Sequence, residues 1–223
     1  MTKKRNTFIS FSHENKNLAL IEEIKGILEE KNIAVDYSEK VDRSDKADET
    51  IWKHLEKRIK GSSVTIIIMT KDLFEENTHK LDYKKGSFLE SGWMYKEISA
   101  SLRNWNLNNI NGIIAVYEPE LETYIQSNAK STCNCCLNKN VTTINLSNEI
   151  IRKNIFNINK KNKTNKNCAY YDTENDHFIS LISLKNFKND PARYIDNAID
   201  KREKQMNDEN YFTIEYNFHK KDN

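Results

Sequence analysis

The sequence predicts an α/β fold in which a doubly wound parallel sheet carries helices on both faces. Two observations indicate this fold. Short apolar runs alternate with stretches in which apolar residues recur at helical spacing. The run VTIIIM at 64–69 is continuously apolar and rich in β-branched residues, which is typical of a strand covered on both faces. Because strands and helices alternate regularly, a parallel sheet is expected.

The first half of the chain supplies this alternation element by element. TFISF at 7–11 is β-prone and ends in a polar stretch, while apolar residues from Leu18 to Leu28 recur at helical spacing until Asn32. A second amphipathic stretch ends at Gly61, a suitable C-cap. The predicted elements are, in order, strand 7–11, helix 18–28, strand 33–37, helix 51–59, strand 64–69, helix 88–102 and strand 110–117.

The alternation weakens after residue 117. Residues 118–140 are polar, and VTTINL at 141–146 predicts a fifth strand. The basic, low-complexity stretch within 152–167 is typical of an exposed loop. Residues 178–184 are compatible with either a strand or a helix. A closing helix is expected over 191–205, with Asp190 as its N-cap and Pro191 at its first position. We expect a domain over 1–146 and a C-terminal extension over 147–223 that packs on it.

Charge and composition exclude several classes of protein. The 223 residues contain 35 Lys and Arg against 33 Asp and Glu, a net charge of +2. This balance gives no broad electrostatic attraction for nucleic acid or anionic lipid, so neither is an expected partner. No signal peptide or membrane-spanning stretch is visible. Three of the four cysteines crowd into one loop, which is not a disulfide framework. A cytoplasmic protein is the expectation.

The cysteines also raise the question of a metal site. Cys133 and Cys136 stand at C-x2-C spacing, and Cys168 and His177 would complete a tetrahedral set for zinc. The second pair is not closely spaced, so reduced thiols in a loop are the favoured interpretation and no metal is expected. The five glycines match neither the GxGxxG pattern nor a P-loop, so the common nucleotide-binding motifs are absent.

The segment FLESGWMYKEI at 88–98 carries the main candidate for catalysis. Trp93 and Glu97 stand one helical turn apart and share a face. A carboxylate beside an aromatic wall suits a reaction that develops positive charge on a sugar carbon, such as cleavage of the N-glycosidic bond of NAD⁺. From spacing alone, an ordinary solvated Glu on an amphipathic helix is the favoured alternative. After the first strand, Ser10, Phe11 and Ser12 are candidate wall residues, whereas His13 fits a surface loop.

Three boxes in order resemble the family of TIR domains. FISFSHEN is similar to the first TIR box, SSVTIIIMTKDLF to the middle element, and Ser91, Trp93 and Glu97 to the SxWxxxE segment that holds the catalytic glutamate. The resemblance covers about half of the chain and is greatest to the stand-alone bacterial ThsB group of the Thoeris antiphage system. It implies a flavodoxin-like, doubly wound sheet.

The resemblance also implies an activity. Such a protein senses phage infection, cleaves NAD⁺ as its substrate, releases nicotinamide and closes ADP-ribose into a cyclic signal that activates a separate effector. No cofactor is implied. A phage protein as trigger and a homo-oligomer are compatible partners. Carried over by position, Glu97 is the catalytic carboxylate. The implied substrate-binding residues are Ser10, Phe11, Ser12, His13, Asp42, Asp45, Ser91 and Trp93.

Two other functions stay open at this point. TIR domains also serve as scaffolds, so a non-catalytic interaction module is the main alternative. A flavodoxin-like binder of flavin or of a phosphorylated receiver partner is the third. The sequence departs from the family in two places: His13 and Glu14 stand where Asp is frequent, and the loop at 41–45 lacks the Gly and Pro of animal and plant TIR domains.

Overall fold

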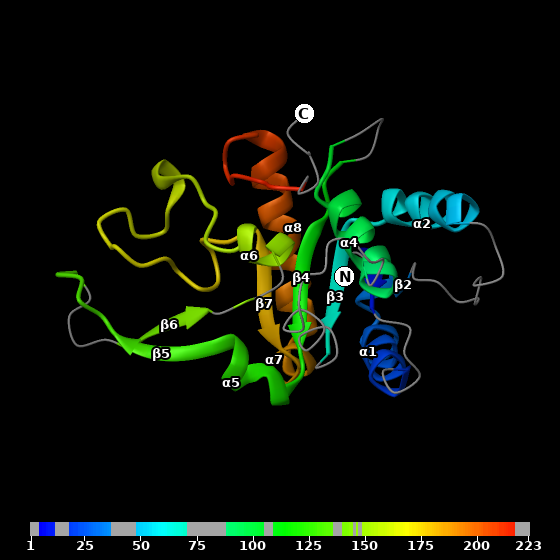
Figure 1. The fold of residues 1–223 in the computed structure, drawn as a ribbon, viewed down its shortest axis with the longest axis horizontal. Coiled ribbons are helices and arrows are strands. Elements are labelled where there is room, and N and C mark those ends of the chain that lie inside the picture. The colour runs from blue at the N-terminus through cyan, green and yellow to red at the C-terminus, as the bar shows by residue number, and fades with distance from the viewer. Residues whose placement is uncertain are drawn as a thin grey trace.

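The computed structural model describes residues 5–11, 18–36, 48–70, 88–104, 109–135, 140–144, 146 and 149–216. Its centre is a five-stranded sheet in the order β2-β1-β3-β4-β7, in which every neighbouring pair is parallel. The strands are β1 (Arg5–Ser10), β2 (Ala34–Asp36), β3 (Val64–Met69), β4 (Gly112–Tyr117) and β7 (Ile179–Ser183). The predicted α/β class with a parallel sheet is therefore confirmed (Figure 1).

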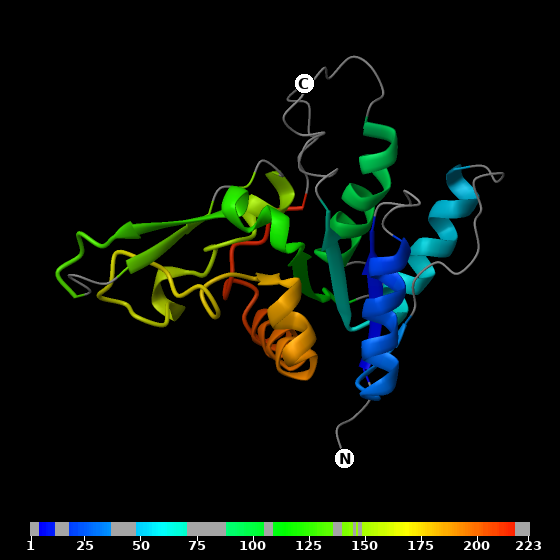
Figure 2. The same ribbon diagram turned by 90° about the horizontal axis from the view of Figure 1, so that it is seen from below.

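Helices cover both faces of the sheet, as Figure 2 shows. On one face, α1 (Leu18–Glu30), α7 (Leu184–Asn189) and α8 (Pro191–Asn207) pack on a cluster that includes Ile66, Ile114 and Phe187. The other face carries α2 (Asp48–Gly61) and α4 (Phe88–Ser101). The central strands β3 and β4 are buried throughout, as expected for strands covered on both sides.

The end of α1 follows the cap that its sequence predicts. Asn32 adopts a φ of 50°, and the amide of Ile33 donates to the carbonyl of Leu28 at 3.1 Å. The amide of Asn32 donates to the carbonyl of Glu29 at 2.9 Å. These two bonds form a Schellman motif, in which a residue in the left-handed region satisfies the last carbonyls of the helix. The chain then turns directly into β2.

The long connection from β4 to β7 leaves the sheet altogether. It contains a short 3-10 turn η2 (Pro119–Leu121), helix α5 (Glu122–Ile125), and an antiparallel hairpin of β5 (Gln126–Lys130) and β6 (Asn140–Ile144). Helix α6 (Glu149–Lys153) and a further 3-10 turn η3 (Lys160–Asn162) follow. Figures 1 and 2 both show the hairpin and the 160–176 segment projecting away from the sheet.

The structure bears on three predictions about this region. The run at 141–146 does contain a strand, β6, but β6 pairs only within the hairpin, and the fifth strand of the main sheet is β7. Of residues 178–184, Ile179–Ser183 form strand β7, and Leu184 begins α7. The low-complexity stretch within 152–167, residues 158–167, is irregular and mostly exposed as predicted, although Ile158 and Lys163 are buried in it.

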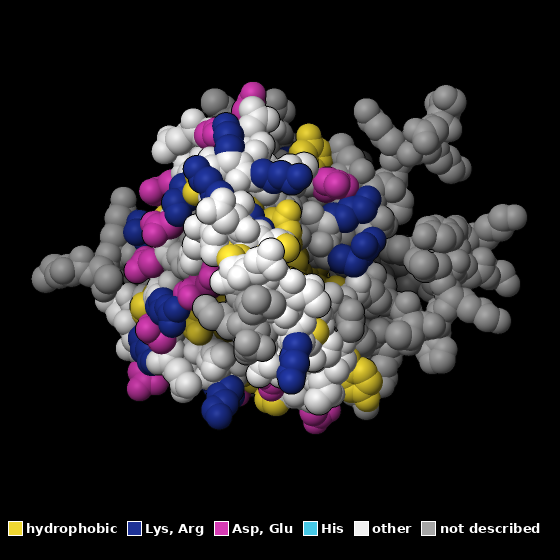
Figure 3. All heavy atoms as spheres, turned by 90° about the vertical axis from the view of Figure 1, so that its left-hand side faces the viewer, with side chains coloured by type: hydrophobic (Ala, Val, Ile, Leu, Met, Phe, Trp, Pro, Cys, Tyr) yellow, Lys and Arg dark blue, Asp and Glu magenta, His cyan; other side chains and the backbone are white. Residues whose placement is uncertain are grey.

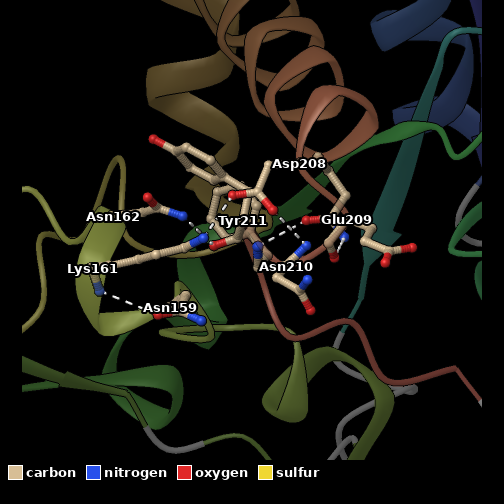
Figure 4. Close-up of polar contacts among 9 residues, drawn as sticks. Asn159, Lys161, Asn162, Asp208, Glu209, Asn210 and Tyr211 are labelled. Carbon is tan, nitrogen blue, oxygen red and sulfur yellow. Dashed lines mark hydrogen bonds and ion pairs between the residues drawn. The ribbon is translucent and has the colours of Figure 1, made fainter.

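The C-terminal turn anchors this irregular stretch to the body of the protein (Figure 4). Lys161 Nζ lies 3.0 Å from Asp208 Oδ2, and the amide of Asn159 donates to the carbonyl of Tyr211 at 3.0 Å. The Lys161 side chain, followed by the amide of Asn210, lowers the pKa of Asp208 below its ordinary value. Residue 158 bridges to Phe212, whose ring is fully buried. Residues 208–216 thus belong to the same packed unit as β7.

The division at residue 146 stays a prediction. The structure adds that 147–223 supplies β7, which pairs with β4, and α8, which packs over β4.

Candidate functional site

The carboxyl ends of the parallel strands meet along one edge of the sheet. Ser10 is the last residue of β1, Thr70 directly follows β3, and Tyr117 and Ser183 end β4 and β7. In open α/β sheets, ligands bind beyond this edge. Among the described residues, the hydroxyl of Thr70 is buried and has no hydrogen-bond partner. This edge is therefore the candidate site.

Ser10 and Glu97 meet at this edge. The Ser10 hydroxyl donates to Glu97 Oε2 at 2.6 Å, and both side chains are buried, with Glu97 only 5% exposed. Since a charged carboxylate is costly to bury without hydrogen bonds, a buried Glu in this position is typical of a functional group rather than of a solvated helix face. The interpretation of Glu97 as an ordinary exposed residue is thus wrong.

A buried polar network fixes the helix that carries Glu97. The Ser101 hydroxyl donates to the carbonyl of Glu97 at 2.8 Å and lies 2.8 Å from the Thr65 hydroxyl of β3. Asn111 Nδ2 donates to Thr65 Oγ1 at 3.1 Å and to Ser62 Oγ at 2.8 Å. These bonds tie α4 to β3 and to the end of α2. The position of Glu97 is consequently set by the core and not by a surface loop.

Ser10 and its neighbour Phe11 point to opposite sides of the sheet. Successive side chains alternate along a strand, so Ser10 faces α4 while the Phe11 ring packs in the cluster beneath α1. Lys25 of α1 lies over the Phe11 ring, with Nζ 5.9 Å from the ring centroid. The part of Phe11 in substrate binding stays a prediction.

The parts of the other predicted site residues stay predictions. Ser12, His13, Asp42 and Asp45 lie outside the described residues. The backbones of Trp93 and Ser91 belong to α4, about one and two turns before Glu97 respectively, but their side chains lie outside the described part.

Sequence reasoning missed Tyr117, which lies at the same edge. Burial raises the pKa of Tyr117 to about 12, and the nearby Glu122 carboxylate acts in the same direction. Gln126 Nε2 donates to the phenol oxygen at 3.0 Å. The phenol therefore stays protonated and can act as a hydrogen-bond donor or acceptor. In the sequence, Tyr117 could have been recognised as a candidate because it is the last residue of an apolar strand, and ligands bind beyond the carboxyl ends of such strands.

The structure gathers a different set of possible metal ligands from the one that spacing suggested. Cys133, Cys135 and Cys168 lie together, whereas Cys136 is outside the described residues. His177 is not part of this group. Its ring is buried in edge contact with the Phe156 ring, with centroids 5.7 Å apart, and burial lowers its pKa well below the ordinary value.

On the face that carries the hairpin, the described residues form no patch of one charge. Lys and Arg side chains are interspersed there with Asp and Glu (Figure 3), as the nearly equal totals of the two charges lead one to expect. Within the described part of the chain, no helix combines the length and the apolar character needed to cross a membrane.

A parallel sheet flanked by helices on both faces is consistent with a flavodoxin-like fold of the TIR type. Residues 8–80 match the family model described as Thoeris protein ThsB, TIR-like domain. The resemblance to this family is thereby confirmed, and it supports a Thoeris-related role in defence signalling. The matched segment covers about a third of the chain and includes Ser10, but it ends before α4 and Glu97.

Proposed function

We propose that this chain is a TIR-type enzyme that cleaves NAD⁺, releases nicotinamide and closes ADP-ribose into a cyclic signal for an antiphage effector. One observation carries the proposal: the buried carboxylate of Glu97 accepts a hydrogen bond from Ser10 at the carboxyl edge of the sheet. The match to the Thoeris ThsB family supports the choice of this chemistry over other reactions at a sugar carbon.

Cleavage of the N-glycosidic bond of NAD⁺ requires mainly a negatively charged group held in a fixed position near the ribose. When the bond between ribose C1′ and the nicotinamide nitrogen breaks, the electron pair leaves with nicotinamide and positive charge remains on the ribose. A carboxylate oriented before the reaction stabilises that charge, and burial strengthens the interaction because less water screens it. Ser10 holds one carboxylate oxygen, so Glu97 loses little orientational freedom when substrate binds.

Ring closure follows from proximity. The adenine of the same molecule is a nucleophile tethered to the ribosyl cation, so a nitrogen of its ring attacks C1′ at high effective concentration and competes with water. The residues proposed to hold the two ends of the substrate are those implied by the family resemblance, above all Ser12, Asp42 and Trp93. A cyclic product rather than free ADP-ribose is thus the expected main product.

The variant Glu97→Gln tests the proposal. Gln is nearly isosteric and keeps the hydrogen bond from Ser10 within reach, but it carries no charge, so nicotinamide release should fall by at least about 100-fold. Purified protein is incubated with NAD⁺, with and without lysate of phage-infected cells, and the products are identified by chromatography and mass. Glu29→Gln, an exposed carboxylate on α1, is the matched control and should keep full activity.

The outcomes separate the proposed enzyme from the scaffold alternative. Full turnover by Glu97→Gln contradicts the role of Glu97. If the unchanged protein releases no nicotinamide with or without infected lysate, a non-catalytic signalling module is the better description.

A further inference from the structure

Three cysteine thiols meet where the β5–β6 hairpin contacts the 160–176 segment. Cys133 and Cys135 follow β5, and Cys168 comes from the irregular segment more than thirty residues later in the chain. Their Sγ atoms all lie within 4.8 Å of one another. The Sγ atoms of Cys133 and Cys135 are 3.0 Å apart, well beyond the roughly 2.05 Å of a disulfide bond. Thiols from two separate segments thus converge on one point.

Hydrogen bonds hold the backbone segments that carry Cys133 and Cys168 next to each other. The amide of Ala169 donates to Cys133 Sγ at 3.3 Å, and the amide of Cys133 donates to the buried Ser131 hydroxyl at 3.1 Å. The amide of Thr132 donates to the Tyr170 hydroxyl at 3.3 Å. An amide that donates to a ligand sulfur is a common supporting contact at metal–thiolate sites. The hairpin turn and the Cys168 segment are therefore held in register.

The Cys168 segment has its own internal support. Lys163 Nζ donates to the carbonyl of Cys168 at 2.5 Å, and Lys163 is itself buried. The fully buried Asp176 carboxylate accepts hydrogen bonds from the amide and hydroxyl of Thr164 at 2.9 and 2.7 Å, and from the amide of Asp172 at 2.8 Å. Cys168 thus stands on a loop whose shape is fixed by buried polar contacts.

We propose that Cys133, Cys135 and Cys168 bind one zinc ion that clips the hairpin to the 160–176 segment. Thiolates are soft ligands that select zinc over magnesium or calcium. Zn–S bonds of about 2.3 Å in tetrahedral geometry place the sulfurs roughly 3.8 Å apart. This separation lies within the 4.8 Å that encloses the three thiols, and the Cys133 and Cys135 sulfurs, 3.0 Å apart, move slightly away from each other to reach it. The fourth position belongs to water or to a further donor. Each ligand gives up a proton as the metal binds.

Cobalt binding tests the site directly. The full-length chain, kept reduced and stripped of metal with a chelator, is titrated with Co²⁺ and followed by absorption. Binding by thiolates gives sulfur-to-cobalt charge-transfer bands, and we expect these bands to saturate at one Co²⁺ per chain and to vanish when zinc is added. The absence of these bands overturns the proposal. The assay uses no NAD⁺, so its outcome is independent of the proposed activity.

Two matched variants test the ligand set. Cys135→Ser should lose the charge-transfer bands, whereas Cys136→Ser, a neighbouring thiol, should keep them with unchanged stoichiometry. The reverse result overturns the set proposed here and favours the C-x2-C arrangement suggested by spacing. Circular dichroism of both variants establishes that the fold is intact. Chelation of the bound metal should also lower the thermal midpoint of the unchanged protein but not that of Cys135→Ser.

Discussion

Ser10 and Glu97 could each be predicted as candidate site residues from the sequence, but the contact between them could not. Each was predicted from its own surroundings, Ser10 at the end of an apolar strand and Glu97 one turn beyond Trp93. The hydrogen bond between them joins residues 87 positions apart, so no local pattern indicates it. Burial of Glu97 likewise depends on how α4 lies against the sheet. The candidates were predictable, but their pairing was not.

The pairing predicts a graded effect for Ser10→Ala. The variant removes one hydrogen bond to a buried carboxylate, which is worth about 1.5–3 kcal/mol, so nicotinamide release should slow by about tenfold or more without being abolished. The decrease should fall on kcat more than on KM, because Ser10 orients the carboxylate rather than the whole substrate.

Steady-state kinetics of Ser10→Ala and Ser10→Thr check this expectation. Thr keeps a hydroxyl at the same position, and partial recovery of kcat by Ser10→Thr supports an orienting role. Equal loss in both variants points to disturbed packing instead.

Lys201 makes stability depend on pH. Burial lowers its pKa from 10.5 to about 7, against the opposing influence of Glu174 and of Asp172 and Asp176. Its amine donates to the Ser180 hydroxyl at 2.9 Å. Between these two pKa values the unfolded chain binds more protons than the folded protein. The free energy of unfolding therefore rises with pH across this window, by up to about 1.4 kcal/mol per pH unit. It decreases correspondingly as the pH falls towards 7.

Lys201→Met should remove this dependence. Urea unfolding of the two proteins between about pH 7.5 and 9 should give a smaller slope of stability against pH in the variant, and a more stable fold at the lower end. Lys185→Met, which alters an exposed lysine on α7, should keep the slope of the parent. An unchanged slope in Lys201→Met contradicts the assignment.

At the scale of elements, caps and periodicity predicted most of the fold. Helix α1 ends at the Asn32 cap, strand β3 has the predicted bounds, and α8 begins with Asp190 Oδ1 accepting from the amide of Arg193 at 3.2 Å. The strand predicted at 141–146 is present as β6, but a strand's own sequence does not state which partner it pairs with. The hydrogen bonds of β6 go to β5, a polar strand without the apolar signature of a buried one.

Gly112 illustrates a constraint between two elements. A Cβ at this position in β4 would lie 2.2 Å from the carbonyl oxygen of Ala198 in α8, so the helix would have to move away from the sheet. Gly112→Ala should therefore destabilise the protein by about 1–3 kcal/mol or more. Gly26 on the exposed side of α1 has nothing within 4 Å, and Gly26→Ala should stabilise it by about 0.5–1 kcal/mol.

Thermal or urea unfolding of the two variants measures both effects. Opposite signs are the expected result. A neutral Gly112→Ala substitution contradicts the close approach of α8 to β4.

At the scale of the whole molecule, the chain is a parallel sheet with a large excursion between its last two strands. The sheet partners β4 and β7 are separated by residues 118–178, which include the hairpin, the cysteine cluster and the buried polar loop. Because a polar composition is typical of loops, the sequence of residues 118–178 did not predict the helices, the hairpin and the buried contacts of this stretch. The buried groups, Asn154, Lys163 and Asp176 among them, are satisfied by backbone atoms that no residue pattern reveals.

The separation of β4 from β7 has a consequence for synthesis. As the polypeptide leaves the ribosome, β4 can pair with β3 at once, but the edge of β4 that pairs with β7 stays unpaired. Strand β7 is synthesised only after the whole of residues 118–178. An uncovered apolar strand is a template for association with other chains. A nascent protein of this topology therefore passes through an interval of exposure that ends when residues 179–183 arrive, and slow translation through 118–178 lengthens the time in which chaperones must shield it.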